Sequence, residues 1–146
     1  MYFNMKPSEM LAVLGTIDPV AQAPGTVTTG WLDCGQFFAT LAAVQTGVLG
    51  AGATVDAKLQ QALDNAGTGV KDIVGRAITQ IVKATGDNKQ ALVNLKGADF
   101  DVEGGFRFVR LSVTVGGAAS QVAAIVYGAM PRMAPVNHQA ATAQVI

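Results

Sequence analysis

Residues 106–115 read Phe-Arg-Phe-Val-Arg-Leu-Ser-Val-Thr-Val and lie between two pairs of glycines. Because side chains of a strand alternate between its two faces, this stretch predicts a long strand with one aliphatic face. The other face carries Phe106 and Phe108, and two phenylalanines are too apolar for a freely solvated surface. We therefore expect another chain segment or another protein to cover part of that face. The residues of the aliphatic face are Val109, Leu111, Val113 and Val115.

Composition limits the classes of function. The chain has 146 residues, of which 50% are hydrophobic and 14% are charged, so it suits one domain with a single core. Ten basic residues balance ten acidic ones, so no large basic face is available for nucleic acid, and we expect no direct nucleic-acid partner. No apolar run approaches the roughly 20 residues that span a bilayer, so we expect no membrane partner. Sparse charge instead favours a subunit that associates with other proteins.

Short apolar or β-branched segments recur along the chain, separated by Gly, Asp and Asn. This spacing is typical of many short strands joined by turns, and no helical period is sustained. The sequence therefore predicts an all-β fold, an antiparallel β-sandwich. Residues 36–44 are almost continuously apolar, as in a strand buried on both faces. Besides 106–115, the predicted strands cover residues 26–32, 36–44, 54–62, 70–74, 78–82, 91–95 and 121–127.

Residues 54–66 fit two patterns. Leu59, Ala62 and Leu63 have the spacing of a helix, and Asp56 stands where an N-cap would. The same stretch also alternates between apolar and polar residues, as a strand does. Because residues 64–69 read Asp-Asn-Ala-Gly-Thr-Gly, which is typical of a hairpin loop, we favour the strand and keep the helix as the alternative.

The two ends of the chain differ from its middle. Residues 1–24 contain three prolines and one short apolar cluster, and residues 131–146 combine two prolines with Ala, Gln and Thr. Such segments hold no core of their own, so we predict an extended N-terminal arm (1–24), a β-sandwich body (25–130) and a C-terminal tail (131–146). The residues expected at a partner interface are Tyr2, Phe3, Met10, Leu11, Val13, Leu14, Phe106 and Phe108.

Two motifs suggest ligand sites, but each lacks a residue that its chemistry needs. The glycine-rich stretch 47–52 suggests a dinucleotide fingerprint, yet Val55 occupies the place of its last glycine or alanine. Residues 99–104 begin like an EF-hand calcium loop, but Arg107 and Arg110 occupy its ninth and twelfth places. Two arginines would repel a cation. We therefore interpret the first motif as a turn and the second as an acidic turn that leads into a strand.

Single reactive residues give no catalytic set. Cys34 has no second cysteine to pair with, and the only histidine, His138, lies in the tail, where it would be a poor general base. We expect a structural thiol at Cys34, a solvated His138, and Trp31 in the core or at an interface. The sequence predicts no catalytic, metal or cofactor-binding residues, and hence a protein that is not an enzyme.

Four segments together resemble a known class of proteins. Residues 53–73 (Ala-Thr-Val-Asp-Ala-Lys-Leu-Gln-Gln-Ala-Leu-Asp-Asn-Ala-Gly-Thr-Gly-Val-Lys-Asp-Ile), 77–81, 105–115 and 127–132 are similar to small virion proteins of tailed bacteriophages, siphophages among them. This class is encoded among head genes and includes jelly-roll capsid decoration (cement) proteins and head-spike proteins. The resemblance extends over about residues 30–132.

The resemblance implies a role that composition alone does not give. It implies a jelly-roll form of the sandwich and a virion structural protein that has no cofactor and binds through surfaces. Its partners would be the major capsid protein and itself, as a homotrimer on the capsid exterior, after synthesis in the host cytoplasm. The alternatives are a head-spike, neck or tail component of the same particle and a carbohydrate-binding receptor module.

Overall fold

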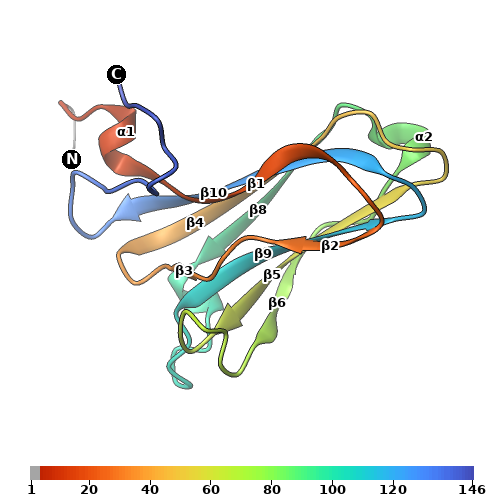
Figure 1. The fold of residues 1–146 in the computed structure, drawn as a ribbon. Coiled ribbons are helices and arrows are strands. Elements are labelled where there is room, and N and C mark those ends of the chain that lie inside the picture. Colours follow the sequence, from red (N-terminus) through yellow and green to blue (C-terminus); the bar gives the residue numbers. More distant parts are fainter. Residues whose placement is uncertain (1–3) are drawn as a thin grey trace.

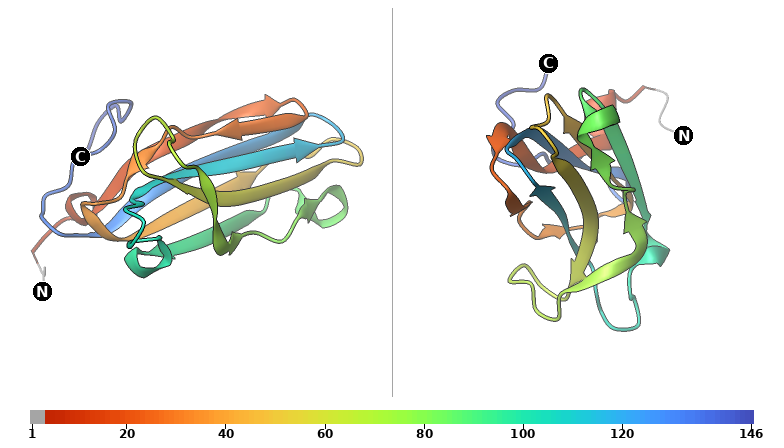
Figure 2. Two further views of the ribbon diagram at one scale, coloured as in Figure 1. Left: turned by 90° about the horizontal axis from the view of Figure 1, so that it is seen from below. Right: turned by 90° about the vertical axis from the view of Figure 1, so that its right-hand side faces the viewer.

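Two antiparallel β-sheets packed face to face form the computed structural model, which describes residues 4–146 (Figures 1 and 2). Sheet A has four strands in the order β1 (Leu11–Gln22), β10 (Ser120–Pro131), β4 (Phe37–Thr46) and β8 (Gln90–Lys96). Sheet B has the order β2 (Gly25–Thr28), β9 (Phe108–Gly116), β5 (Thr54–Ala62) and β6 (Lys71–Ala77), with β3 (Leu32–Asp33) on β9 and β7 (Ile81–Val82) on β5. The predicted antiparallel β-sandwich is confirmed.

The strand order is nested. β1 pairs with β10, β2 with β9 and β4 with β8, so early strands of the chain lie beside late ones. The chain also crosses between the two sheets from β1 to β2 and from β4 to β5. This arrangement, with the first and last strands adjacent, is that of a jelly roll.

Over residues 4–146, helical structure is confined to single turns. These are α1 (Pro7–Met10), α2 (Lys83–Gly86) and the 3-10 turn η1 (Gly97–Asp99). Within residues 4–146, no helix has the length and apolar character needed to cross a membrane.

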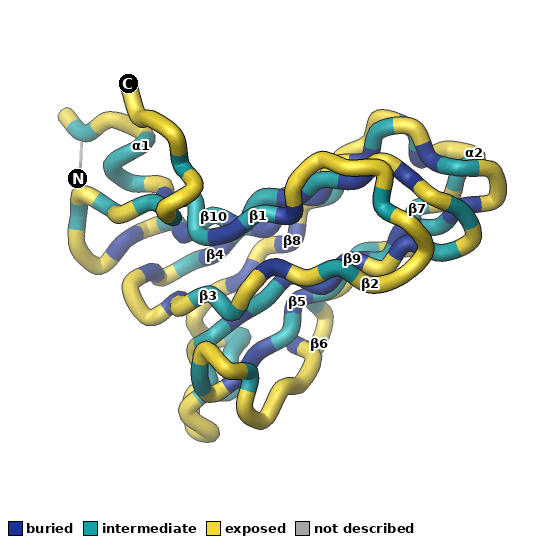
Figure 3. Tube along the Cα trace, viewed as in Figure 1, coloured by how far each residue is buried: buried dark blue, intermediate teal, exposed yellow. Residues whose placement is uncertain are grey.

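The core lies between the sheets, where the burial-coloured trace is darkest (Figure 3). The aliphatic face of β9 is fully buried, as predicted, with Val109 and Leu111 at 0% exposure and Val113 and Val115 at 1%. Opposite it, β4 and β10 of sheet A contribute small aliphatic residues, which let the two layers approach closely. The core residues of those two strands are Ala42, Val44, Val122, Ala124 and Val126.

Residues 54–62 form strand β5 and not the alternative helix. Val55 and Leu59 lie in the core, and residues 63–70 form the loop to β6, as the hairpin reading predicted. Sheet pairing on both sides of β5 therefore prevails over the helical spacing of its last residues.

The expected arm differs from the structure. Residues 11–22, assigned to an extended arm, form the edge strand β1, in which Ala12 and Ile17 are buried in the core. Pro19 is tolerated because an edge strand needs hydrogen bonds on one side only, and the pairing with β10 is irregular between Ile17 and Val20. The body of the protein therefore begins well before residue 25.

Four further strand predictions need correction. Residues 26–32 are split into β2 and β3, and only Ile81–Val82 of the predicted strand 78–82 pairs as a strand. β9 begins at Phe108, so Phe106 lies in the loop before it. Buried and half-buried positions alternate over residues 40–44, and Phe38 and Gln45 are exposed, so β4 is not buried equally on both faces.

Candidate functional site

The outer surface of sheet A is apolar over its two central strands. Alternate residues of β4 and β10 point into the core, and those between them point outward. In the middle of both strands the outward residues are half-buried, whereas Gln45 and Gln121 toward one end are exposed. At the margins of the sheet the surface is extended by Leu11 and Val13 of β1 and by Leu92 of β8, which is 62% exposed. We call this surface the outer apolar face. It consists of Leu11, Val13, Ala39, Leu41, Ala43, Leu92, Ala123, Ile125, Tyr127 and Ala129.

The outer surface of sheet B has the opposite character. Lys58 pairs with Asp72 at 2.8 Å, and Arg110 donates to Gln60 at 2.9 Å while its guanidinium lies 4.6 Å from the ring of Trp31. These side chains satisfy one another within the subunit. Of the two sheets, sheet A therefore presents the broad apolar surface, in which Tyr127 carries the one polar side-chain group.

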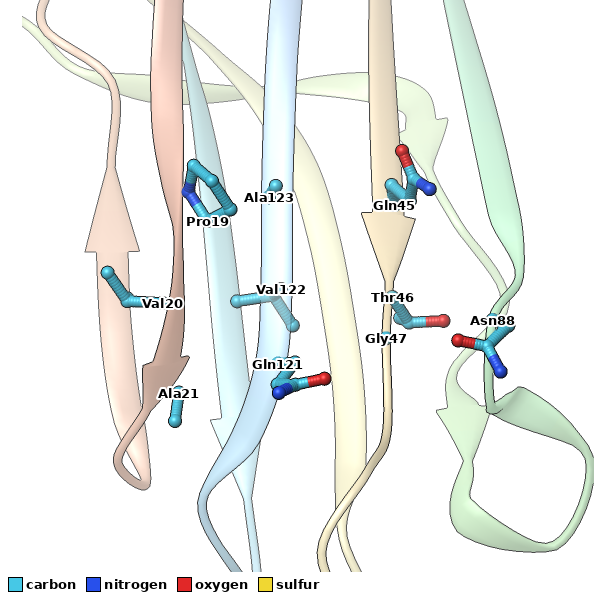
Figure 4. A pocket seen from close by; sticks show the side chains of 10 residues that line it. All are labelled: Pro19, Val20, Ala21, Gln45, Thr46, Gly47, Asn88, Gln121, Val122 and Ala123. Carbon is cyan, nitrogen blue, oxygen red and sulfur yellow. The ribbon is translucent and has the colours of Figure 1, made fainter.

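A hollow of about 460 Å³ lies at one end of sheet A (Figure 4). Ala123 lies on its floor, and Gln45, Gln121 and Asn88 place amide groups around it. The Gln121 Oε1 accepts a hydrogen bond from the Val48 amide at 3.1 Å, which fixes one of these side chains. The described residues that line the hollow are all uncharged.

The described residues among those predicted for an interface lie in several places. Tyr2 and Phe3 lie outside the described residues. Leu11 and Val13 belong to the outer apolar face, whereas Leu14 packs against the core beside an irregularity in β1. Met10, at the end of α1, is half-buried.

Phe106 and Phe108 lie at sheet B, away from the other predicted interface residues. The Lys71 ammonium lies 4.1 Å from the Phe106 ring, and the Arg107 guanidinium lies 5.3 Å from the Phe108 ring. Both phenylalanines are half-buried. Their cover therefore comes in part from cationic side chains of the same chain.

Cys34 is a buried thiol. Its exposure is 6%, and Thr40 Oγ1 donates a hydrogen bond to Sγ at 3.4 Å. Burial destabilises the thiolate, and it raises the pKa of the Cys34 thiol to about 11. Such a thiol is a poor nucleophile at neutral pH.

His138 is more constrained than the sequence indicated. Its Nδ1 accepts a hydrogen bond from the Val13 amide at 3.1 Å, and its Nε2 lies 2.9 Å from the Ser8 carbonyl oxygen. The next residue, Gln139, donates its amide to the Val13 carbonyl at 2.8 Å. His138 therefore fastens the tail to the free side of β1, and no nearby spacing in the sequence indicates that role.

The carboxylates of the acidic turn already have partners. Asp99 pairs with Arg76 at 2.8 Å and accepts from the Lys96 amide at 2.7 Å, while Asp101 accepts from Lys71 and from the Gly104 amide. Arg107, which the sequence placed beside this turn, pairs instead with Asp33. Among residues 4–146, no group of three or more His, Cys, Asp or Glu residues is arranged to hold a metal ion.

The sequence reading missed the central part of the outer apolar face. Leu41, Ile125 and Tyr127 were treated as ordinary members of apolar strands. The sequence does contain a signal for this face. Residues 37–46 and 120–131 are mostly apolar on both faces of the strand that each forms, with small residues at many positions. Such a strand is either covered on both sides within its own fold or covered by a partner.

Comparisons with known proteins give no family. No family model matches the chain, and no curated protein matches it. Among solved structures, a chain of the cowpea mosaic virus top component, a naturally occurring empty particle, is 12% identical with a TM-score of 0.45, over 92% of this chain and 89% of that one. A Bacillus endospore appendage, a disulfide-linked pilus, is 10% identical with a TM-score of 0.36, over 89% and 99%. A chain of infectious bursal disease virus is 12% identical with a TM-score of 0.29, over 85% of this chain and 37% of that one.

Proposed function

We propose that this protein is a non-enzymatic structural component of a virus particle, and specifically a decoration protein that binds the outside of a tailed-phage head. The outer apolar face carries the proposal. Its half-buried and exposed aliphatic residues lie on a regular sheet, where a second protein can remove them from water. The resemblance of residues 53–73 and 105–115 to phage virion proteins supplies the kind of particle.

Several features of the described residues support a binding role. The buried thiol of Cys34 is held protonated, and His138 bonds to the backbone of α1 and β1. The hollow beside Gln45 and Gln121 contains amides and small apolar residues. Amides and apolar side chains are the groups expected where two protein surfaces meet.

The proposed partner is the major capsid protein, and the proposed place is the capsid exterior. Self-association as a homotrimer, which the resemblance implies, would let one unit contact several capsid subunits. A head-spike, neck or tail position in the same particle is the second candidate. The ratio of this protein to the major capsid protein in purified virions separates the two, because a lattice decoration is abundant and a vertex or tail component is not.

A binding experiment with matched variants tests the proposed surface. Ile125→Glu places a charge on the outer apolar face, and Thr114→Glu places the same charge on the exposed outer side of β9 in sheet B. Heads that lack the protein are mixed with each purified variant and separated by density gradient. We expect Thr114→Glu to bind as the unmodified protein does and Ile125→Glu to bind at least about 10-fold more weakly, since it would desolvate an unpaired carboxylate. Equal binding by both variants would exclude this face as the capsid contact.

A further inference from the structure

Strand β8 leaves one side of its backbone open. The Thr46 amide donates to the Lys89 carbonyl at 2.9 Å. In the same register, Ala91, Val93 and Leu95 direct their backbone N–H and C=O groups toward the neighbouring strand β4. The residues between them therefore direct their N–H and C=O groups away from the sheet. Lys96 agrees with this alternation, because its outward amide is capped by the Asp99 carboxylate at 2.7 Å.

The outward backbone groups of Gln90, Leu92 and Asn94 have no hydrogen-bond partner among the described residues. All three residues are exposed, and β8 lies at the margin of sheet A (Figure 2). The strand pairs with β4 without a bulge and contains no proline. An open, regular edge of this kind is a template for another strand.

The other sheet edges are protected. β1 has two irregularities and contains Pro19, and the tail already occupies both backbone groups of Val13. β6 is interrupted by a bulge and by Gly75, whose φ is 72°. β2 is only four residues long. Proline, bulges, short strands and covering segments are the usual means of preventing strand addition, and β8 has none of them over residues 90–94.

We propose that β8 pairs with β8 of a second copy of this chain, antiparallel and centred on Leu92. Since only residues 90, 92 and 94 offer outward groups, a two-fold pairing about Leu92 uses all of them. Leu92 then faces Leu92 of the second copy, and Gln90 faces Asn94. Each directly opposed pair exchanges two backbone hydrogen bonds.

The side chains favour this self-pairing. Leu92, 62% exposed in the single chain, packs against its own copy, and the two amides can bond to each other. In this register Lys96 stands opposite Asn88 and Lys89 opposite Leu95, so no two lysines are directly opposed. The outer apolar face also continues across the pair. The contact goes beyond a role in the virion, because it forms between two copies whatever else they bind.

A cysteine at the centre of the pair tests its geometry. Leu92→Cys brings two thiols together across the two-fold axis, at a Cα separation of about 5.5 Å that a disulfide accepts. Val74→Cys is the control, because Val74 is 96% exposed on the bulged strand β6. Under mild oxidation we expect Leu92→Cys to form disulfide-linked pairs at least about 10-fold faster than Val74→Cys, owing to the high effective concentration of the two thiols. Equal rates would overturn the proposed pairing.

A pair of opposite charge substitutions at Leu92 distinguishes self-pairing from any other contact. Leu92→Lys and Leu92→Glu each place like charges opposite one another, and the exposed site lets both variants fold, which circular dichroism verifies. In sedimentation velocity we expect the unmodified chain to associate, each variant alone to lose that association, and a one-to-one mixture of the variants to regain it. Failure of the mixture to associate, or undiminished association of either variant alone, would rule out a β8–β8 pair.

Discussion

At the scale of single residues, β9 shows that neighbouring positions face different environments. Val113 is 1% exposed between the sheets, whereas Thr114 is exposed and its Oγ1 lies 2.8 Å from that of Thr26. Val113→Asp should therefore unfold the protein, because a buried unpaired carboxylate costs several kcal/mol against a typical stability of about 5 to 15 kcal/mol. Thr114→Asp should shift the urea midpoint only slightly. Comparable losses in both variants would mean that the two faces of β9 are equally buried.

The thiol of Cys34 gives a second prediction at this scale. With its pKa at about 11, roughly 0.1% of the thiol is ionised at pH 8, and the thiolate is the reactive form. A disulfide reagent such as DTNB should therefore react with the native protein far more slowly than with the protein in concentrated urea. Rapid stoichiometric labelling of the native chain would show that the site opens readily to solvent.

At the scale of elements, the carboxylates that tie loops to strands predict an acid dependence. The pKa values of these carboxyls lie below their ordinary value, for Asp99 through the Arg76 hydrogen bond first and then the Lys96 amide. A group with a lowered folded-state pKa stabilises the fold above its unfolded pKa of 3.8, and this stability is lost as the pH falls through the folded value. The carboxyls with a lowered pKa belong to Asp64, Asp72, Asp87, Asp99 and Asp101.

The melting temperature should therefore decline as the pH falls below about 4. Asp99→Asn removes one of the titrating groups, so this variant should be less stable near neutral pH and should lose less on acidification. Parallel curves for the two proteins, measured by calorimetry at each pH, would contradict a role for Asp99 in the acid dependence.

The same turn should not bind calcium specifically. Asp99 and Asp101 are paired with Arg76 and Lys71, and binding of Ca²⁺ would have to displace both cations. Millimolar calcium added after chelation should leave the melting temperature unchanged. A rise of several degrees would show that the carboxylates exchange their partners for the ion.

Element β1 shows what the sequence could and could not provide. The alternation of residues 106–115 predicts β9 because its aliphatic positions are strictly periodic. In β1 the period is broken near Leu14 and at Asp18-Pro19, so the segment has the composition of an arm although its pairing partner β10 holds it in the sheet. The outer apolar face cannot be predicted from local pattern for a related reason. It is assembled from strands distant in sequence and depends on their register, which local pattern does not give.

Deletion experiments follow from this placement of β1. Removal of residues 1–24 takes away an edge strand with buried Ala12 and Ile17, so the shortened chain should not fold. Removal of residues 1–5, which retains α1 and β1, is the control for this deletion. A soluble, cooperatively unfolding product of the longer deletion would show that β10 can serve as the edge of sheet A.

At the scale of the whole molecule, the proposed decoration role predicts a property of particles. If many copies bind the head through the outer apolar face, their individually weak contacts combine into a strong total stabilisation by multivalency. Heads that lack this protein should therefore release DNA at a lower temperature than decorated heads, as measured by dye accessibility during heating. Addition of the purified protein should restore the higher temperature, whereas the Ile125→Glu variant should not.

The nested strand order also governs how the chain reaches its structure. Leu11 pairs with Ala129 and Gly25 with Val115, so strands made early in synthesis wait for those made last. Long loops must close before such contacts contribute, so folds of this kind take about milliseconds to seconds to form, whereas helical bundles take about microseconds to milliseconds. Until β10 leaves the ribosome, the apolar sides of β1 and β4 lack the strand that lies between them. Chaperones that shield exposed strands during synthesis should therefore decide the yield of this protein more than its final stability does.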